Sequence, residues 1–432
     1  MKEMKKEMKQ KQVNIITNSI NLFNIYIYVP AGSIYEKDKI RGISHLLEHM
    51  LMKRTKNYTN KGLSSEITKI GGISNAGTSK DVTYYYIKTH IDNYKTAVKI
   101  MSDIIHSPVF LNEELATEKK IVLEEFAKNK DDIDSILDIE STRNILGNQN
   151  EYSYPIIGTQ KDISSITISD LKTYIKKHYS NYMVLVNCDK KYLDEVTKYI
   201  YMHFSKDTFQ LPDESTLKYI NHVNKSGEIY CTNNSEYSQY KTVLSFITYP
   251  VTDINNIIKF NFIKYILTSS GFNSILFSEI REKRGLVYSI SSYNEDNRYN
   301  GIYKIVFSST NPNTPYIISI ILSCLQNLIT KGLSENKIKY YKKSFLNRTK
   351  YIFSNEDVKE MWYGNLLFYN IPITYEEYLN KIKAIKNEDI MKISKEIFNF
   401  KHMGVATHGK YTNNAIIKDI QEIKDTYYSL LN

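Results

Sequence analysis

Residues 42–55 read GISHLLEHMLMKRT, and three polar residues recur at helical spacing in this largely apolar stretch. His45, Glu48 and His49 lie at positions i, i+3 and i+4, so on a helix that advances about 100° per residue they point in the same direction. The leucines and methionines around them predict that the rest of the helix is buried. Burying two imidazoles and a carboxylate together is costly unless another group pairs with them.

A metal ion is one partner that would satisfy this cluster. Two histidines one turn apart can bind Zn²⁺, which leaves the carboxylate between them free to activate a water molecule. The alternative is a helix on which His45, Glu48 and His49 form ordinary hydrogen bonds to neighbours or solvent. The metal hypothesis needs a third protein ligand, because catalytic zinc sites use three protein ligands and keep one open position.

The segment 118–125, EKKIVLEE, contains candidates for this third ligand. Glu118 and Glu125 are seven residues apart and share one face of the predicted helix, whereas Glu124 points in another direction. A helix rich in glutamate and lysine is more commonly a solvated face. The spacing alone therefore leaves both interpretations open.

The composition is that of a soluble folded protein with at least two domains. The chain has 432 residues, 42% of them hydrophobic and 24% charged, which argues against disorder and against a fibrous repeat. The net charge of +10 comes from lysines scattered along the chain, so we expect no nucleic-acid partner.

Further features bear on the cellular compartment. Three widely spaced cysteines fit a reducing environment and exclude a disulfide framework. The first twelve residues lack the apolar core of a secretory signal, and residues 311–330 have the pattern of an amphipathic helix rather than a membrane span. We therefore expect a cytoplasmic protein with no membrane partner.

Strands and helices alternate in a similar order in the two halves of the chain, which predicts an α+β fold. Each half is expected to form a mostly antiparallel β-sheet packed with several α-helices. We predict an N-terminal zinc-binding domain over 13–205, a linker over 206–228 and a C-terminal domain over 229–432. Within them, residues 113–144 and 375–398 are each expected to form one continuous helix.

HLLEH followed by EKKIVLEE resembles the zinc peptidases of the M16 (pitrilysin-like) family, in which the HxxEH motif is inverted. The 76 residues from His49 to Glu125 match the family's interval between second histidine and third ligand. Further similar segments are VPAGSIYEKDKIRGISHLLEHML, KIGGISNAGTSKDVTYYY and FSEIREKRGLVYSI. The resemblance covers nearly the whole chain and is greatest for the small two-domain type found in bacteria and in the mitochondrial processing peptidase.

The resemblance implies a role for each matching position at the metal. His45, His49 and Glu125 would bind one zinc ion per chain. Glu48 would act as the general base toward the zinc-bound water, and Glu118 would support the site from behind the ligands. The resemblance therefore implies a metalloendopeptidase, and the C-terminal half, which lacks an HxxEH motif, would be non-catalytic.

The resemblance also implies how a peptide would bind. The strand containing Ser74, Asn75 and Ala76 would accept the substrate as an added β-strand. Arg281 and Tyr288 in the second half would bind substrate carbonyls and the oxyanion. Without the resemblance, Arg281 would be interpreted as a solvated helix end and Tyr288 as a core aromatic.

Three hypotheses for the function follow. The first is a zinc endopeptidase that hydrolyses peptides or unfolded segments inside a chamber, which would require a homodimer or a heterodimer with a related M16-like subunit. The second is a dedicated maturation peptidase for a ribosomally made peptide. The third is a subunit working with a catalytically inactive homologous partner, and a purely structural subunit is disfavoured because the His45, Glu48, His49 and Glu125 set is complete.

Overall fold

The computed structural model describes residues 12–205, 207–213, 217, 220, 227–233, 239–310, 312–411 and 413–431. The chain forms two compact units. The first contains Met1–Asn129, Tyr154–Lys218 and Glu360–Pro372, and the second contains Lys130–Ser153, Tyr219–Lys359 and Ile373–Asn432. Most of the expected linker over 206–228 lies outside the described residues, as does the N-terminal stretch 1–11.

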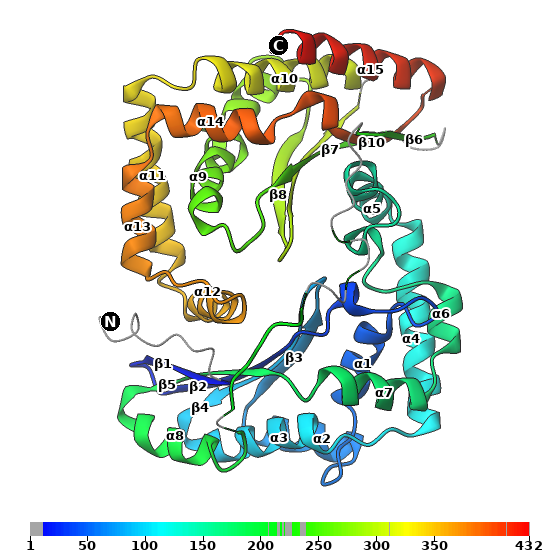
Figure 1. Cartoon of the computed structure of the whole chain (residues 1–432), viewed down its shortest axis with the longest axis vertical. Coiled ribbons are helices and arrows are strands. Elements are labelled where there is room, and N and C mark those ends of the chain that lie inside the picture. Colours follow the sequence, from blue (N-terminus) through cyan, green and yellow to red (C-terminus); the bar gives the residue numbers. More distant parts are fainter. Residues whose placement is uncertain are drawn as a thin grey trace. The chain divides into compact units, whose positions relative to one another are not determined.

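Each unit is built on one five-stranded mixed sheet (Figure 1). The first sheet has the order β1-β5-β2-β4-β3, with strands β1 (Val13–Asn18), β2 (Leu22–Val29), β3 (Ile73–Thr78), β4 (Thr83–His90) and β5 (Met183–Asp189). The second has the order β6-β10-β7-β9-β8, with strands β6 (Ile229–Asn233), β7 (Tyr240–Thr248), β8 (Ser289–Asp296), β9 (Gly301–Ser309) and β10 (Gly404–Gly409).

The two sheets have the same topology. In each, one strand pair is parallel, β1 with β5 and β6 with β10, and the other pairs are antiparallel. The predicted fold class, α+β with two similar halves, is confirmed. β3 and β8 lie at corresponding edges of their sheets.

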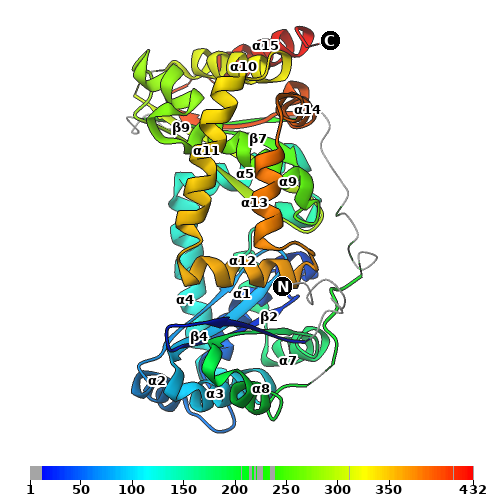
Figure 2. The same cartoon turned by 90° about the vertical axis from the view of Figure 1, so that its left-hand side faces the viewer.

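Helices pack against both sheets (Figures 1 and 2). The first half of the chain contributes α1 (Ile43–Leu51), α2 (Asn60–Lys69), α3 (Tyr94–His106), α4 (Asn112–Asp131), α5 (Ile133–Leu146), α6 (Gln160–Ser165), α7 (Ile168–His178) and α8 (Leu193–Ile200). The second half contributes α9 (Ile254–Lys264), α10 (Thr314–Thr330), α11 (Glu335–Ile352), α12 (Glu356–Phe368), α13 (Tyr375–Ala384), α14 (Asn387–Ile397) and α15 (Asn413–Ser429).

Strand β2 shows why the first sheet needs a cover on both faces. Successive side chains in a strand point to opposite faces of the sheet. In the β2 sequence LFNIYIYV, the side chains of Phe23, Ile25 and Ile27 therefore enter the main core. Asn24, Tyr26 and Tyr28 point the other way and are also buried. The covering element on that face is helix α12, from the second half of the chain.

Helix α12 is anchored to this face by one buried carboxylate. Glu360, which is fully buried, accepts hydrogen bonds from Asn24 Nδ2, Tyr26 Oη and Asn187 Nδ2, each at 2.6 Å. Farther along the helix, a Cβ atom on Gly364 would lie only 2.2 Å from the Tyr28 hydroxyl. Glycine at this position therefore allows the helix to approach the sheet closely.

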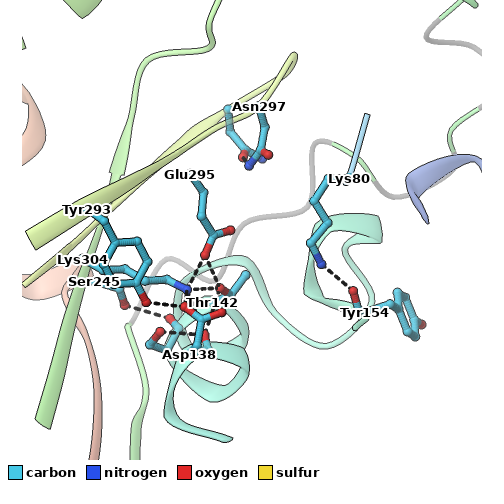
Figure 3. A network of polar contacts seen from close by, with 11 residues as sticks. Lys80, Asp138, Thr142, Tyr154, Ser245, Tyr293, Glu295, Asn297 and Lys304 are labelled. Carbon is cyan, nitrogen blue, oxygen red and sulfur yellow. Dashed lines mark hydrogen bonds and ion pairs between the residues drawn. The ribbon is translucent and has the colours of Figure 1, made fainter. Parts of the chain in front are cut away.

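The second sheet is covered in the corresponding way by α5, from the first half of the chain. Lys304 on β9 is fully buried, and its ammonium group lies 2.6 Å from Asp138 Oδ1 and 2.8 Å from Thr142 Oγ1, both on α5 (Figure 3). Lys304 also pairs with Glu295 of β8. Each unit thus includes one helix from the opposite half of the chain, and in both cases a carboxylate near the second turn of that helix reaches a polar group on the sheet.

Two expected long helices are each interrupted, so these predictions were wrong. The expected helix over 113–144 is α4 followed by α5, because the Asp132 side chain accepts a hydrogen bond from the Ser135 amide and starts a new helix. The expected helix over 375–398 is α13 followed by α14, and there Asp389 accepts from the Lys386 amide. Helix α12 was not predicted.

Among the described residues, no single helix has the length and apolar character needed to cross a membrane. Helices α10 and α11 meet these criteria only when taken together, and the pair is bent by 106°.

We predict that replacing Glu360 with alanine lowers the free energy of unfolding by about 3 kcal/mol, because three buried donors lose their acceptor at once. Urea denaturation followed by circular dichroism measures this loss. Met361→Ala on the same helix is the control, since Met361 is largely exposed, and its effect should stay within about 0.5 kcal/mol. Equal effects of the two substitutions would contradict the assigned anchor.

Candidate active site

The helix that carries the HxxEH motif begins at a well-defined point. Gly42, its N-cap, has φ +92°, and a Cβ there would lie 2.4 Å from the Ile157 carbonyl oxygen, so the position requires glycine. The buried carboxylate of Glu36 accepts hydrogen bonds from the amides of Gly42 (2.7 Å) and Ser44 (2.9 Å). These contacts satisfy donors that the first turn of a helix leaves free.

The rest of α1 is held by the core. Leu46, Leu47, Met50 and Leu51 have no exposed surface, as the sequence predicted for the apolar side of this helix. The polar side is therefore fixed in direction. His45 and His49 lie together on it, with ring centroids 4.7 Å apart.

Glu125 of α4 joins the two imidazoles. One ligand atom from each of His45, His49 and Glu125 can be chosen so that all three lie within 4.8 Å of one another, and His45 Nε2 lies 3.8 Å from Glu125 Oε2. Burial and the neighbouring His49 lower the pKa of His45, which keeps this ring neutral at neutral pH. A neutral imidazole is the form that binds metal ions.

These residues fit a bound zinc ion. Two imidazoles and one carboxylate are ligands that zinc accepts, and three protein ligands leave a fourth position open. The Nδ1 atom of His45 is buried and has no hydrogen-bond partner among the described residues. His49 Nδ1 lies 3.2 Å from Glu118 Oε2, so Nε2 of this ring is the nitrogen left for a metal.

Glu118 of α4 contacts the cluster through His49. It is buried, and its two oxygens have different partners. Oε2 faces His49, and Oε1 lies 2.9 Å from the ammonium group of Lys53. Glu118 therefore contacts the cluster through an imidazole.

Glu48 lies between the two histidines in sequence and is held from the sheet. Its Oε2 atom accepts a hydrogen bond of 2.7 Å from the Thr78 hydroxyl at the end of β3. Burial raises the pKa of Glu48, and the hydrogen bond from Thr78 opposes this shift. The Thr78 hydroxyl occupies Oε2, so Oε1 is the carboxylate oxygen that is available to accept a proton from another group.

The expected substrate strand is β3, at the edge of the first sheet. Its inner side pairs with β4, in a register that places Asn75 opposite Tyr86 and Ala76 opposite Tyr85. Asn75 is exposed, and its Oδ1 atom accepts a hydrogen bond from the Ala76 amide. Within the described residues no strand pairs with the outer side of Ser74, Asn75 and Ala76.

Arg281 and Tyr288 lie together on the second unit. The Arg281 guanidinium carbon is 5.5 Å from the centroid of the Tyr288 ring and 4.8 Å from that of Phe277. Tyr288 is 81% exposed, so the alternative interpretation of this residue as a core aromatic was wrong. Arg281 is half-buried.

Two residues near the cluster, Thr78 and Lys53, were not predicted from the sequence. Thr78 occurs in the segment that contains Asn75, but nothing in its spacing relates it to Glu48, which lies on a different element. Lys53 lies beyond the end of α1, and no short-range pattern relates it to Glu118 on α4.

Comparisons with known proteins identify the family. Residues 15–160 match the profile of the insulinase family, peptidase family M16, and residues 165–345 match that of the M16 peptidase inactive domain. An uncharacterized zinc protease of Rickettsia felis is 27% identical over 382 residues, which are 87% of this chain and 89% of that protein. Mitochondrial-processing peptidase subunit beta of Saccharomyces cerevisiae is 33% identical over 182 residues, 41% of this chain and 38% of that protein.

A solved structure shows the same fold. The crystal structure of a protease from Helicobacter pylori aligns with a TM-score of 0.80 at 20% identity, and the alignment covers 92% of this chain and 96% of that one. The chain belongs to the M16 peptidase family and is a zinc metalloprotease with one candidate His-His-Glu metal site. This confirms the resemblance found in the sequence.

We predict that Glu125→Ala weakens zinc binding at least about 100-fold, because it removes one of the three protein ligands. Competition with a chromogenic chelator measures the affinity. Glu124→Ala is the matched control: this adjacent side chain is exposed on the same helix, and its variant should bind zinc as the unchanged protein does. Comparable losses in both variants would contradict the assigned ligand.

Proposed function

We propose that this protein is an endopeptidase that hydrolyses peptides or unfolded segments bound as an added strand along β3. The observation that carries the proposal is the convergence of His45, His49 and Glu125 with Glu48 one helical turn from His45. The family assignment supports peptide-bond hydrolysis, and this ligand set supports a zinc ion as the cofactor.

The proton transfers follow from the position of Glu48. A zinc ion bound by the three ligands would lower the pKa of a coordinated water to about 7 and polarise the scissile carbonyl. Glu48 would accept the proton of the attacking water and later donate it to the leaving amine. Thr78 holds one carboxylate oxygen of Glu48, so the other keeps a defined direction during both transfers.

Binding along β3 would supply affinity without strong sequence preference. A sheet edge offers main-chain donors and acceptors that pair with any extended peptide. The Asn75 amide adds one side-chain contact beside this edge. The Arg281 and Tyr288 pair is proposed to bind the carbonyl groups and the oxyanion, and the exposure of Tyr288 supports that role.

We predict that Glu48→Gln abolishes peptide hydrolysis but retains zinc, because the amide cannot accept the proton and Glu48 is not a ligand. Cleavage of a quenched fluorescent peptide should fall by at least about 100-fold, in line with the contribution of a general base. Glu124→Gln, on an exposed position, should cleave at the unchanged rate. Full activity of Glu48→Gln with zinc bound would exclude the proposed base.

The active assembly is proposed to contain two chains that enclose the substrate in a chamber. Either two copies of this chain or one copy with a related, catalytically inactive M16-like subunit would form it. The similarity to a subunit of the mitochondrial processing peptidase supports the second arrangement as an alternative. A role in maturing one ribosomally made peptide is a narrower form of the same activity.

Light scattering tests the assembly. For a homodimer we predict a mass of about 101 kDa, twice the 50.5 kDa of one chain. An active species of that mass supports the homodimer. An inactive monomer that gains activity only with a related subunit supports the heterodimer, and a fully active monomer contradicts the chamber.

A further inference from the structure

A lysine just beyond the HxxEH helix completes a chain of contacts that leads to a metal ligand. Lys53 follows the C-cap of α1, and its Nζ atom lies 2.9 Å from Glu118 Oε1. The other oxygen of Glu118 faces His49 Nδ1 at 3.2 Å. The carboxylate thus links an ammonium group to an imidazole, and its side chain is only 5% exposed.

In this chain of contacts Glu118 can orient His49, and Lys53 can orient Glu118. An imidazole that binds a metal through Nε2 carries a proton on Nδ1, and an acceptor at that proton fixes the orientation of the ring. A carboxylate with a single partner can rotate about its side-chain bonds, whereas contacts to both oxygens fix its plane. The ammonium group of Lys53 also balances the charge of a buried carboxylate that no other cation contacts among the described residues.

We propose that Lys53 is a positioning residue for the metal centre, acting on His49 through Glu118. This inference rests on the proposed function, since it concerns the same site. Lys53 is not one of the three residues whose ligand atoms converge. Its loss should weaken zinc binding while leaving the fold intact, because its side chain is 30% exposed and contributes little to the core.

A second ion pair provides a matched structural control. Arg54, the next residue, donates to Glu114 from Nε at 3.0 Å and from Nη2 at 2.8 Å. Glu114 lies one turn before Glu118 on α4, so both pairs join the same two segments. Only the Lys53 pair continues to a histidine, so a merely structural role would make the two pairs equivalent for zinc binding.

The experiment measures zinc affinity by chelator competition for Lys53→Met, Lys53→Arg, Arg54→Met and Lys120→Met. Lys120 is exposed on α4 and controls for the loss of one positive charge. We expect Lys53→Met to weaken zinc binding about tenfold, as removal of an outer partner commonly does. Lys53→Arg should restore most of the affinity, and the two control variants should bind zinc within twofold of the unchanged protein.

A double-mutant comparison tests the route through Glu118. If Lys53 acts on His49 only through this carboxylate, Lys53→Met should cause no further loss in a Glu118→Gln background. The absorption spectrum of the cobalt-substituted protein gives a second readout, and it should change in Lys53→Met but not in Arg54→Met. Thermal unfolding of the zinc-free proteins identifies any variant that fails to fold.

Three results would overturn the inference: zinc affinity of Lys53→Met within twofold of the unchanged protein, an equal loss in Arg54→Met, or an equal loss from Lys53→Met in both backgrounds. The proposed function fails separately, if the unchanged protein neither binds zinc nor cleaves a peptide. Normal cleavage and zinc binding by the unchanged protein, with no effect of Lys53→Met, would reject only the positioning role.

Discussion

The contact between α1 and α4 is the constraint on which the candidate site depends. The two histidines lie on one helix and Glu125 lies on the other, so no three-ligand site exists unless the helices are held together. Glu118 and Glu125 occupy one face of α4, two turns apart, and this face is directed at the polar side of α1. Val122 lies between them and is fully buried, so apolar packing and polar contacts act on the same helix face.

Both helices are also restrained from outside this contact. The start of α1 is set by Gly42 and by the buried carboxylate of Glu36, and its apolar side is surrounded by the core. The Arg54–Glu114 pair joins the segment after α1 to α4, whereas the Lys53–Glu118 pair also reaches His49. A metal-binding histidine needs a fixed ring direction, because a small change in ligand direction lowers affinity.

The duplicated architecture explains how one half carries the candidate metal site while both halves contribute to folding. The sheets share one topology, yet the HxxEH motif occurs only in the first half. Each unit also takes one helix from the opposite half, anchored by Glu360 in one unit and by Asp138 with Lys304 in the other. Buried charges with several hydrogen-bond partners suit this task, because they are satisfied only in the native pairing.

The sequence by itself determined what depends on local spacing. The positions of His45, Glu48 and His49 on one side of a buried helix follow from a period of 3.6 residues. The family resemblance added Glu125 as the third ligand. Neither the residue spacing nor the family resemblance indicated that α4 and α5 are separate helices, because a single side-chain cap at Asp132 causes that break.

Only the tertiary structure decided which distant groups meet. The contacts of Thr78 with Glu48, of Lys53 with Glu118 and of Glu360 with the polar face of β2 join elements that no short-range pattern relates. The physical reason is that burial makes each of these polar groups require a partner, while the identity of that partner depends on how the whole chain packs.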